Sequence, residues 1–176
     1  MSLKKEVTIQ QGMMALPGFP VVLVCVRDNI ITVAAFSFFS FGDKEGVPPM
    51  IMVGIVPTRY TFELLKEIDD YSVNIPTVEL LEAVKICGSK SGRDVDKFKV
   101  AGLTPKKAQR ISSYIIEECP INLECKVVHK IDLQGSSHTW FVGEIVTAYQ
   151  REDYDRSQAI LYWPREYREV GKVIKK

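Results

Sequence analysis

Apolar residues in this chain gather in short runs separated by turn residues, a pattern typical of strands. An uninterrupted apolar run, mostly of β-branched valines, fills residues 21–26. An Asp-Asn turn signal follows, and residues 30–36 return as a second strand. Two prolines precede a third apolar strand at 50–56, and a fourth is expected at 71–75. The first half of the chain is therefore predicted to consist mainly of antiparallel strands.

The second half shows the same pattern over longer segments. Residues 123–133 and 139–149 are predicted to form a hairpin joined by a Gly- and Ser-rich turn. One short strand is expected at 114–116, within an otherwise irregular stretch rich in Lys and Ser. The tail at 159–170 is too apolar to be a free end.

Three short helices interrupt the strands. The first is predicted to be capped by Thr58, and the second to cover residues 78–86 and to be stopped by Gly88. The third is predicted to be capped by Asp94, to run through Val100 and to be stopped by Gly102. Strands dominate and do not alternate with crossover helices, which excludes a doubly wound parallel sheet. The predicted fold is mainly β with short helices, arranged as a small antiparallel barrel.

Composition limits the possible functions. With 176 residues, 46% of them hydrophobic, the chain is expected to form a single domain over 1–176, with 1–16 as a flexible or strand-adding segment. Twenty-three basic and 22 acidic residues give a net charge of +1, so neither nucleic acid nor a membrane surface is an expected partner. No membrane span or signal peptide is recognised, and a cytoplasmic location is expected.

The four cysteines form no Cys-x-x-Cys pair, and the chain has two histidines, so no metal site is expected. Cys25 and Cys125 fall inside predicted strands, where a core position is favoured over a redox role.

The loop between the second and third helices concentrates groups that bind anions. It contains Gly88, Ser89, Lys90, Ser91, Gly92 and Arg93. The glycines can take a positive φ and turn N–H groups inward, the serines add hydroxyl donors, and the cations supply charge. The loop therefore predicts a phosphate pocket.

Two further segments, 32–39 and 54–63, occur with this loop in a characteristic order and spacing. With all three, the chain resembles the flavin reductase-like proteins of the FMN-binding split-barrel superfamily, and among them the flavoredoxins. The resemblance runs from about residue 17 to residue 171. It implies a Greek-key split barrel that forms a homodimer, with FMN in the groove between the subunits.

The resemblance also implies where the flavin ring would lie. The strand end whose backbone would follow the ring consists of Thr32, Ala34, Ala35, Phe36, Ser37 and Phe38. Where Thr32, Ala35 and Phe38 stand, the family usually has Asn, Pro and Trp, so side-chain specificity should differ more than cofactor identity. The alternative is that these aromatic residues belong to the core and its rim.

The FMN phosphate would be held from two sides. One side is the start of the first helix, with Thr58, Arg59, Tyr60 and Thr61, and the other is the loop with Ser89, Lys90, Ser91 and Gly92. A phosphomonoester carries about −1.5 to −2 charges near neutral pH, which suits such a set. The alternative for Arg59 is a solvated side chain beside an ordinary helix cap.

Three residues are weaker candidates. His129 would end an inward-facing row of alternate strand residues and could reach the flavin from a barrel mouth, or it could be a core histidine bonded to backbone. Tyr162 would contact the flavin from the tail, with core packing as the default. His138 is expected to pin the hairpin turn rather than to bind.

Two classes of function follow. In the first, NADH or NADPH reduces bound FMN, which passes electrons to free flavin or another acceptor, so the protein is an oxidoreductase. In the second, it is a flavoredoxin-type electron carrier that serves a redox partner protein and has no pyridine-nucleotide site. The cofactor performs the redox chemistry in both.

Overall fold

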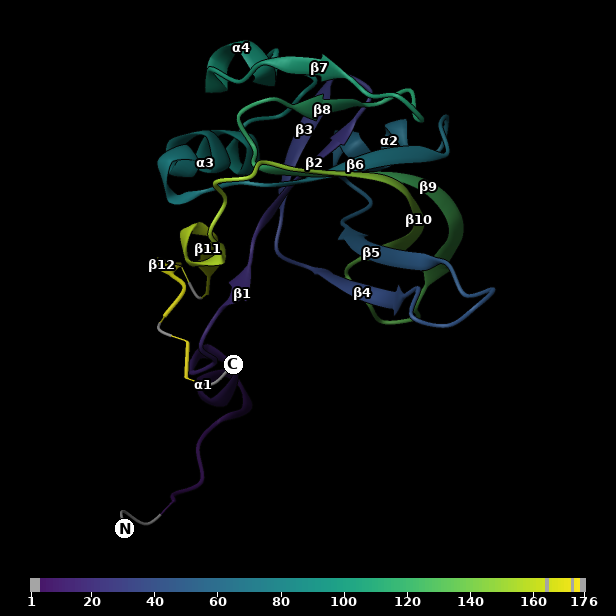
Figure 1. Ribbon diagram of the computed structural model, residues 1–176. Helices are drawn as coiled ribbons and strands as arrows, with labels where there is room; N and C mark the ends of the chain where they lie inside the picture. Colours follow the sequence, from purple (N-terminus) through teal and green to yellow (C-terminus); the bar gives the residue numbers. More distant parts are fainter. Residues whose placement is uncertain (1–3, 164, 172, 175–176) are drawn as a thin grey trace.

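The computed structural model describes residues 4–163, 165–171 and 173–174. Its centre is a curled, seven-stranded antiparallel sheet with the order β3-β2-β6-β9-β10-β5-β4 (Figure 1). The strands are β2 (Val22–Val26), β3 (Asn29–Val33), β4 (Phe36–Phe41), β5 (Pro49–Ile55), β6 (Asp70–Ile75), β9 (Ile121–Asp132) and β10 (Thr139–Gln150). The prediction of a mainly antiparallel β fold is confirmed, and the curled sheet forms half of a barrel.

Both faces of this sheet are covered at β2, whose five residues are all buried. Val22, Val24 and Val26 of β2 belong to an apolar cluster on one face, and Leu23 and Cys25 belong to a second cluster on the other. Burial on both faces explains why β2 is an uninterrupted apolar run rather than an alternating one.

All four cysteines are free thiols in the interior. Burial raises the pKa of Cys25 and of Cys125 far above the ordinary thiol value. The predicted core positions of these two residues are confirmed.

The helices are short and connect the strands. They are α2 (Tyr60–Leu64), η1 (Val78–Leu80), α3 (Leu81–Ser89) and α4 (Lys97–Ala101). Gly102 ends α4 with φ of 66°, as predicted. The predicted end of α3 at Gly88 is wrong, because the Lys90 N–H still bonds the Ile86 carbonyl at 2.9 Å. Asp96, not Asp94, caps α4 and accepts the Lys99 N–H at 3.2 Å.

The predicted strand 30–36 is two strands. β3 ends at Val33, the chain turns away at Ala34 and Ala35, and β4 then pairs with β5 at the opposite edge of the sheet. The break opens the sheet beside α3. A further pair, β7 (Pro105–Lys107) with β8 (Tyr114–Ile116), lies outside the main sheet, and only β8 is predicted by the sequence pattern.

Segments near the two ends of the chain form a separate sheet of β1 (Phe19–Pro20), β11 (Ile160–Tyr162) and β12 (Tyr167–Glu169). The short helix η2 (Arg156–Gln158) comes directly before β11. The segment 4–16 contains a helix, α1 (Ile9–Met14), which begins with a capping box at Thr8. It does not add a strand to a sheet. α1 has no buried residue and projects from the body of the molecule (Figure 1). Within the described residues, no helix has the length and apolar character needed to cross a membrane.

Candidate functional site

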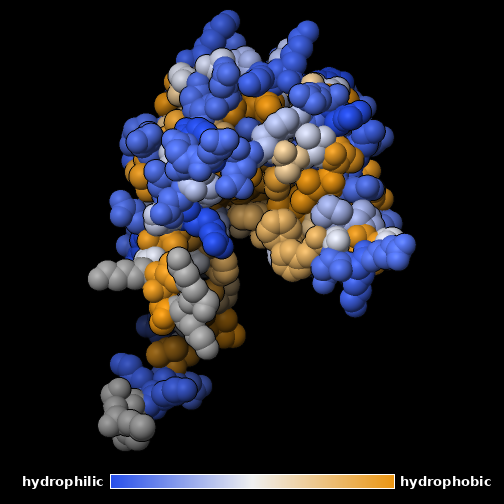
Figure 2. All heavy atoms as spheres, viewed as in Figure 1, coloured by the Kyte–Doolittle hydropathy of each residue, from blue (hydrophilic) through white to orange (hydrophobic). Residues whose placement is uncertain are grey.

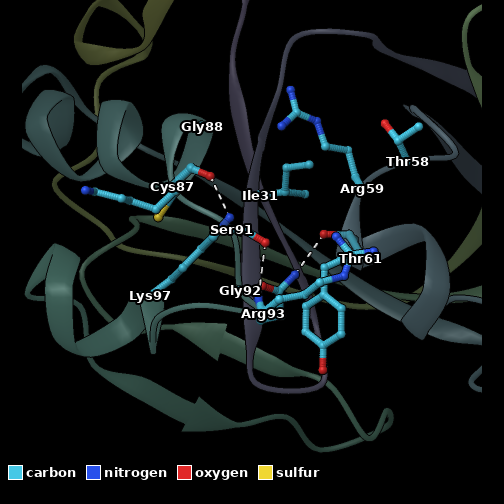
Figure 3. Close-up of a pocket in the computed structure, with 13 residues that line it drawn as sticks. Ile31, Thr58, Arg59, Thr61, Cys87, Gly88, Ser91, Gly92, Arg93 and Lys97 are labelled. Atoms are coloured by element: carbon cyan, nitrogen blue, oxygen red, sulfur yellow. Dashed lines mark hydrogen bonds between the residues drawn. The ribbon is translucent and has the colours of Figure 1, made fainter.

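A pocket of about 160 Å³ lies where β3, the start of α2 and the loop after α3 meet (Figure 3). Residues Thr58, Arg59, Tyr60 and Thr61 line it from one side, and Lys90, Ser91, Gly92 and Arg93 line it from the other. These are the two segments that the sequence predicts to share a phosphate. The structure brings them together although about thirty positions separate them in the chain.

The pocket is rich in positive charge. Arg93 is committed within the protein, since its guanidinium pairs with Glu63 at 2.5 Å and lies 5.4 Å from the centre of the Tyr60 ring. Arg59 and Lys90 make no ion pair with any described residue. Two cations without an ionic partner among the described residues are therefore available to an anionic ligand.

Lys97 is a fourth cation at this pocket, and the sequence analysis does not identify it. Its side chain is buried, with 4% of the residue exposed, and Nζ donates to the carbonyls of Ile30 at 2.7 Å and Cys87 at 2.8 Å. Burial lowers its pKa, which nearby Cys87 raises and nearby Arg59 lowers further. A lysine directly after a helix cap is usually a surface residue, so the sequence pattern does not indicate that the Lys97 side chain is buried.

Asn29 supplies an unpaired acceptor at the same pocket. Its Nδ2 donates to Thr61 Oγ1 at 2.8 Å, whereas its buried Oδ1 has no hydrogen-bond partner among the described residues. A buried carbonyl oxygen without a donor is costly, and Gly92 packs directly against this one.

Gly92 is required for space rather than for its backbone conformation. A Cβ at Gly92 would lie 1.9 Å from Asn29 Oδ1, and neither Gly88 nor Gly92 has a positive φ. The predicted positive φ at these glycines is therefore wrong. Each instead lets two segments approach closely, since a Cβ at Gly88 would come within 3.4 Å of Thr32 Cβ.

A second pocket continues from the first, and the two share Ile31, Arg59 and Gly88. It lies at the break between β3 and β4 and is lined by Thr32, Val33, Ala34 and Ala35 together with Gly54, Ile55, Val56 and His138. The Gly54 N–H donates to the Ala35 carbonyl at 2.6 Å. The break thus presents a strip of backbone with small side chains, next to the cationic pocket.

The side chain of Thr32 is already engaged, because its hydroxyl donates to the Val84 carbonyl at 2.6 Å. Any contact of this residue with a ligand therefore depends mainly on its backbone and its remaining lone pairs.

A third pocket, bounded by Thr32, Ala34 and Gly88 on the side of the second, also includes Tyr162 and Ser89. Tyr162 packs against Tyr167 with ring centres 4.9 Å apart. Ser89 is not brought to the cationic pocket, because its hydroxyl donates to the Lys85 carbonyl of its own helix at 2.8 Å. Its predicted place beside Lys90 and Ser91 at the phosphate is not supported.

Farther along β4 the predicted ring-binding residues separate. Phe36 packs on the core, whereas Ser37 and Phe38 are exposed and line none of the three pockets. The Phe38 ring lies 5.1 Å from that of Phe41. A contact of Ser37 or Phe38 with a flavin stays a prediction.

The predicted inward row on β9 is wrong at His129. Val127 pairs with Gly143 and His129 with Val142, so Val128 is an extra residue in a β-bulge that reverses the alternation. Lys130 is therefore the residue that returns to the core side, with Nζ 5.2 Å from the centre of the Phe62 ring. His129 is exposed and outside the three pockets, and its contact with a flavin stays a prediction.

The remaining chemistry of the site is not nucleophilic. Cys87 lines the cationic pocket, but burial raises the pKa of its thiol to about 11, with nearby Lys97 lowering it only partly. A protonated thiol is a poor nucleophile at neutral pH. Within residues 4–163, 165–171 and 173–174, no three His, Cys, Asp or Glu side chains are grouped to hold a metal ion.

The fold is similar to that of two solved structures, which match this chain with the same sequence identity and the same TM-score. Flavoredoxin of Desulfovibrio vulgaris (Miyazaki F) is 26% identical, with a TM-score of 0.85 over 99% of this chain and 97% of that one. Flavoredoxin from Methanosarcina acetivorans is also 26% identical with a TM-score of 0.85, over 99% of this chain and 95% of that one.

Sequence relatives include an uncharacterized protein of Archaeoglobus fulgidus, 38% identical over 56% of this chain and 55% of the relative. Another is an uncharacterized protein of Pyrococcus abyssi, 32% identical over 60% of this chain and 59% of the relative. The chain thus matches little more than half the length of these two relatives.

The flavin reductase like domain family matches residues 13–171. This confirms the resemblance read from the three segments, and the curled antiparallel sheet with few helices is the split barrel of these proteins. Since the match covers most of the chain, the protein belongs to the family of flavin reductase like domains.

Proposed function

We propose that this protein binds FMN, with the phosphate in the cationic pocket and the ring along the backbone at residues 32–35. The observation that supports this most strongly is the continuity of the two pockets. Arg59, Gly88 and Ile31 belong to both, so a single elongated ligand can occupy the cationic end and the small-residue strip together.

The donor set fits this cofactor. A phosphomonoester with about −1.5 to −2 charges matches the free cations Arg59 and Lys90, with Ser91 as a neutral donor.

Bound FMN would supply the hydride and one-electron chemistry. The chain's own residues would bind the phosphate, orient the ring against backbone and limit the access of water. The protonated Cys87 thiol and the absence of a metal-binding group in the described part of the chain leave the protein with a binding and tuning role.

The proposed reaction is the reduction of a flavin or another acceptor by NADH or NADPH through bound FMN. The second candidate is an electron carrier between protein partners, favoured by the likeness to two flavoredoxins over nearly their whole length. The two differ in whether a nicotinamide can dock on the ring.

A homodimer is part of the proposal. The segment around α1 exposes Val7, Ile9, Met13, Met14 and Leu16, and the β4 region exposes Phe38, Phe39, Phe41 and Val47. Figure 2 shows apolar side chains around the hollow between the projecting segment and the body. Two such apolar surfaces on one molecule are suited to mutual burial around a two-fold axis.

An anaerobic spectrum of the FMN-loaded protein, followed by addition of NADH or NADPH, distinguishes the two reactions. Rapid bleaching of the flavin band is expected for the reductase. A band that responds only to dithionite or to a reduced partner protein would contradict the reductase and support the carrier.

A further inference from the structure

Lys97 differs from the other cations of the site in being an interior residue. It begins α4, yet its side chain runs into the protein and reaches the base of the cationic pocket (Figure 3). An ammonium group is rarely buried unless a charge partner accompanies it. No carboxylate pairs with Lys97 among the described residues.

The contacts of Nζ account for two of its three N–H donors. They go to the carbonyls of Ile30 on β3 and Cys87 on α3, at 2.7 and 2.8 Å. Two neutral carbonyls orient the ammonium but leave its charge uncompensated. The third donor remains for a group in the pocket.

We propose that Lys97 is the interior cation of the phosphate site: it compensates the ligand phosphate from below while Arg59 and Lys90 approach from the open side. This inference rests on the proposed FMN binding and extends it to a residue outside the recognised motifs. A buried charge interacts with a phosphate through less solvent than an exposed one, so its contribution is screened less by water and salt.

The charges around Lys97 support a link between phosphate binding and protonation. The titratable and charged groups around the Lys97 side chain come from four segments. The α3 side contributes Cys87 and Lys90, and the α2 side contributes Arg59 and Tyr60. The β2–β3 turn contributes Asp28, and the segment of Lys97 itself contributes Arg93, Asp94 and Asp96. Burial lowers the pKa of Lys97 in the empty pocket, and a phosphate dianion would raise it again. Binding of FMN at alkaline pH should therefore take up protons.

The direct test compares the binding of FMN with that of riboflavin, in the wild-type protein and in Lys97→Met. This substitution keeps an unbranched side chain of similar length and removes its charge. We expect FMN affinity to fall about ten-fold to a hundred-fold, as for loss of a charge-assisted contact, with riboflavin affinity unchanged. Lys99→Met is the matched control, because Lys99 lies on the same helix with an exposed side chain, and it should leave both affinities unchanged.

A second measurement needs no variant at Lys97. Calorimetric titration across the alkaline pH range, in two buffers of different ionisation enthalpy, should show proton uptake with FMN and none with riboflavin. Lys90→Ala should retain the uptake. Equal weakening of both flavins in Lys97→Met, an unchanged affinity of that variant for FMN, or proton uptake that disappears in Lys90→Ala would overturn the assignment and leave Lys97 as a scaffold residue. Failure of the wild type to bind either flavin would instead overturn the proposed function, and the assignment with it.

Discussion

At the scale of single residues, the cations of the pocket differ in how far the protein already uses them. Arg93 is held by Glu63 and by the Tyr60 ring, whereas Lys90 has no ionic partner in the described chain. An exposed cation without a partner contributes little to folding but can neutralise a ligand. The contribution of Lys90 should therefore appear in binding and not in stability.

Lys90→Ala is expected to weaken FMN about ten-fold to a hundred-fold, since a charge-assisted contact is worth roughly 1.5 to 3 kcal/mol. Riboflavin lacks the phosphate and should bind as before. The melting temperature of the apo-protein should change little. Fluorescence titration and thermal unfolding check the two effects, and a lower melting temperature with unchanged FMN affinity would make Lys90 a structural residue.

Gly92→Ala should disturb both the fold and the pocket. The new Cβ would lie 1.9 Å from Asn29 Oδ1, so Asn29 must move and its hydrogen bond to Thr61 would be strained. A loss of about 1–3 kcal/mol in the free energy of unfolding, as is usual for overpacking, is expected together with weaker FMN binding. The control is Gly171→Ala, where a Cβ would meet nothing within 4 Å. Equal stability of the two variants would contradict this role of Gly92.

The sequence predicts the exposed residues of the site better than the buried ones. Lys90 and Arg59 are recognisable because cations beside glycines and hydroxyls are a local pattern. Lys97 and Asn29 act through contacts with segments distant in the chain, which no local pattern contains. Ser89 is misplaced for the reverse reason, because its hydroxyl is satisfied within its own helix.

At the scale of elements, two irregularities of the strands determine the site. The break at Ala34 and Ala35 creates the second pocket, and the bulge at Val128 turns His129 away from the core. The sequence pattern predicts an uninterrupted strand at both positions. Hydrophobic alternation and β-propensity contain no information on which strand is the partner or where the pairing shifts. Strand existence was therefore predictable at these places, whereas strand geometry was not.

Asp70 of β6 fixes the loop before β8, and the pH dependence of stability should reveal it. Its carboxylate accepts four hydrogen bonds from Ser112 and Ser113, at 2.6–3.0 Å. Burial raises its pKa, but these bonds outweigh burial and lower it on balance. The ionised form is thus favoured in the folded state.

Because the folded pKa of Asp70 is depressed, its contribution is present above the unfolded value of about 3.9 and is lost as pH falls through the folded pKa. Asp70→Asn should lower the free energy of unfolding at pH 7 by about 1–2 kcal/mol and much less near pH 2. Urea unfolding at both values measures this. Asp43→Asn, an exposed position, is the control, and a pH-independent effect of Asp70→Asn would contradict the role of its charge.

At the scale of the whole molecule, the segment with α1 is held in place although its helix buries nothing. Trp163 Nε1 donates to the Met13 carbonyl at 2.8 Å, and the Phe19 ring meets Trp163 edge-on at 5.7 Å. A segment so held, with Ile9 84% exposed, is suited to contact a second subunit.

Ile9→Glu is therefore expected to weaken the proposed homodimer, because a carboxylate would have to be buried in an apolar contact. Sedimentation at micromolar concentration should give a dimer for the wild type and a larger monomer fraction for the variant. Lys5→Glu, in the same exposed segment, is the charge control and should remain dimeric. A wild-type monomer of 19.9 kDa with flavin fully bound would contradict the dimer.

The overall architecture was largely predictable, because hairpin spacing and the three motif segments constrain it together. The three-stranded sheet of the chain ends was not, since its strands are only two or three residues long. Such short strands depend on tertiary contacts rather than on local propensity. The N-terminal helix was missed although Thr8 and Gln11 form the capping box that marks its start.

The most direct measurement is a parallel titration of the purified protein with FMN and with riboflavin, followed by fluorescence quenching. Binding of about one FMN per chain, at least about ten-fold tighter than riboflavin, is predicted from the charge of the pocket. Equal dissociation constants for the two flavins would contradict the assignment of Arg59, Lys90 and Ser91 to the phosphate.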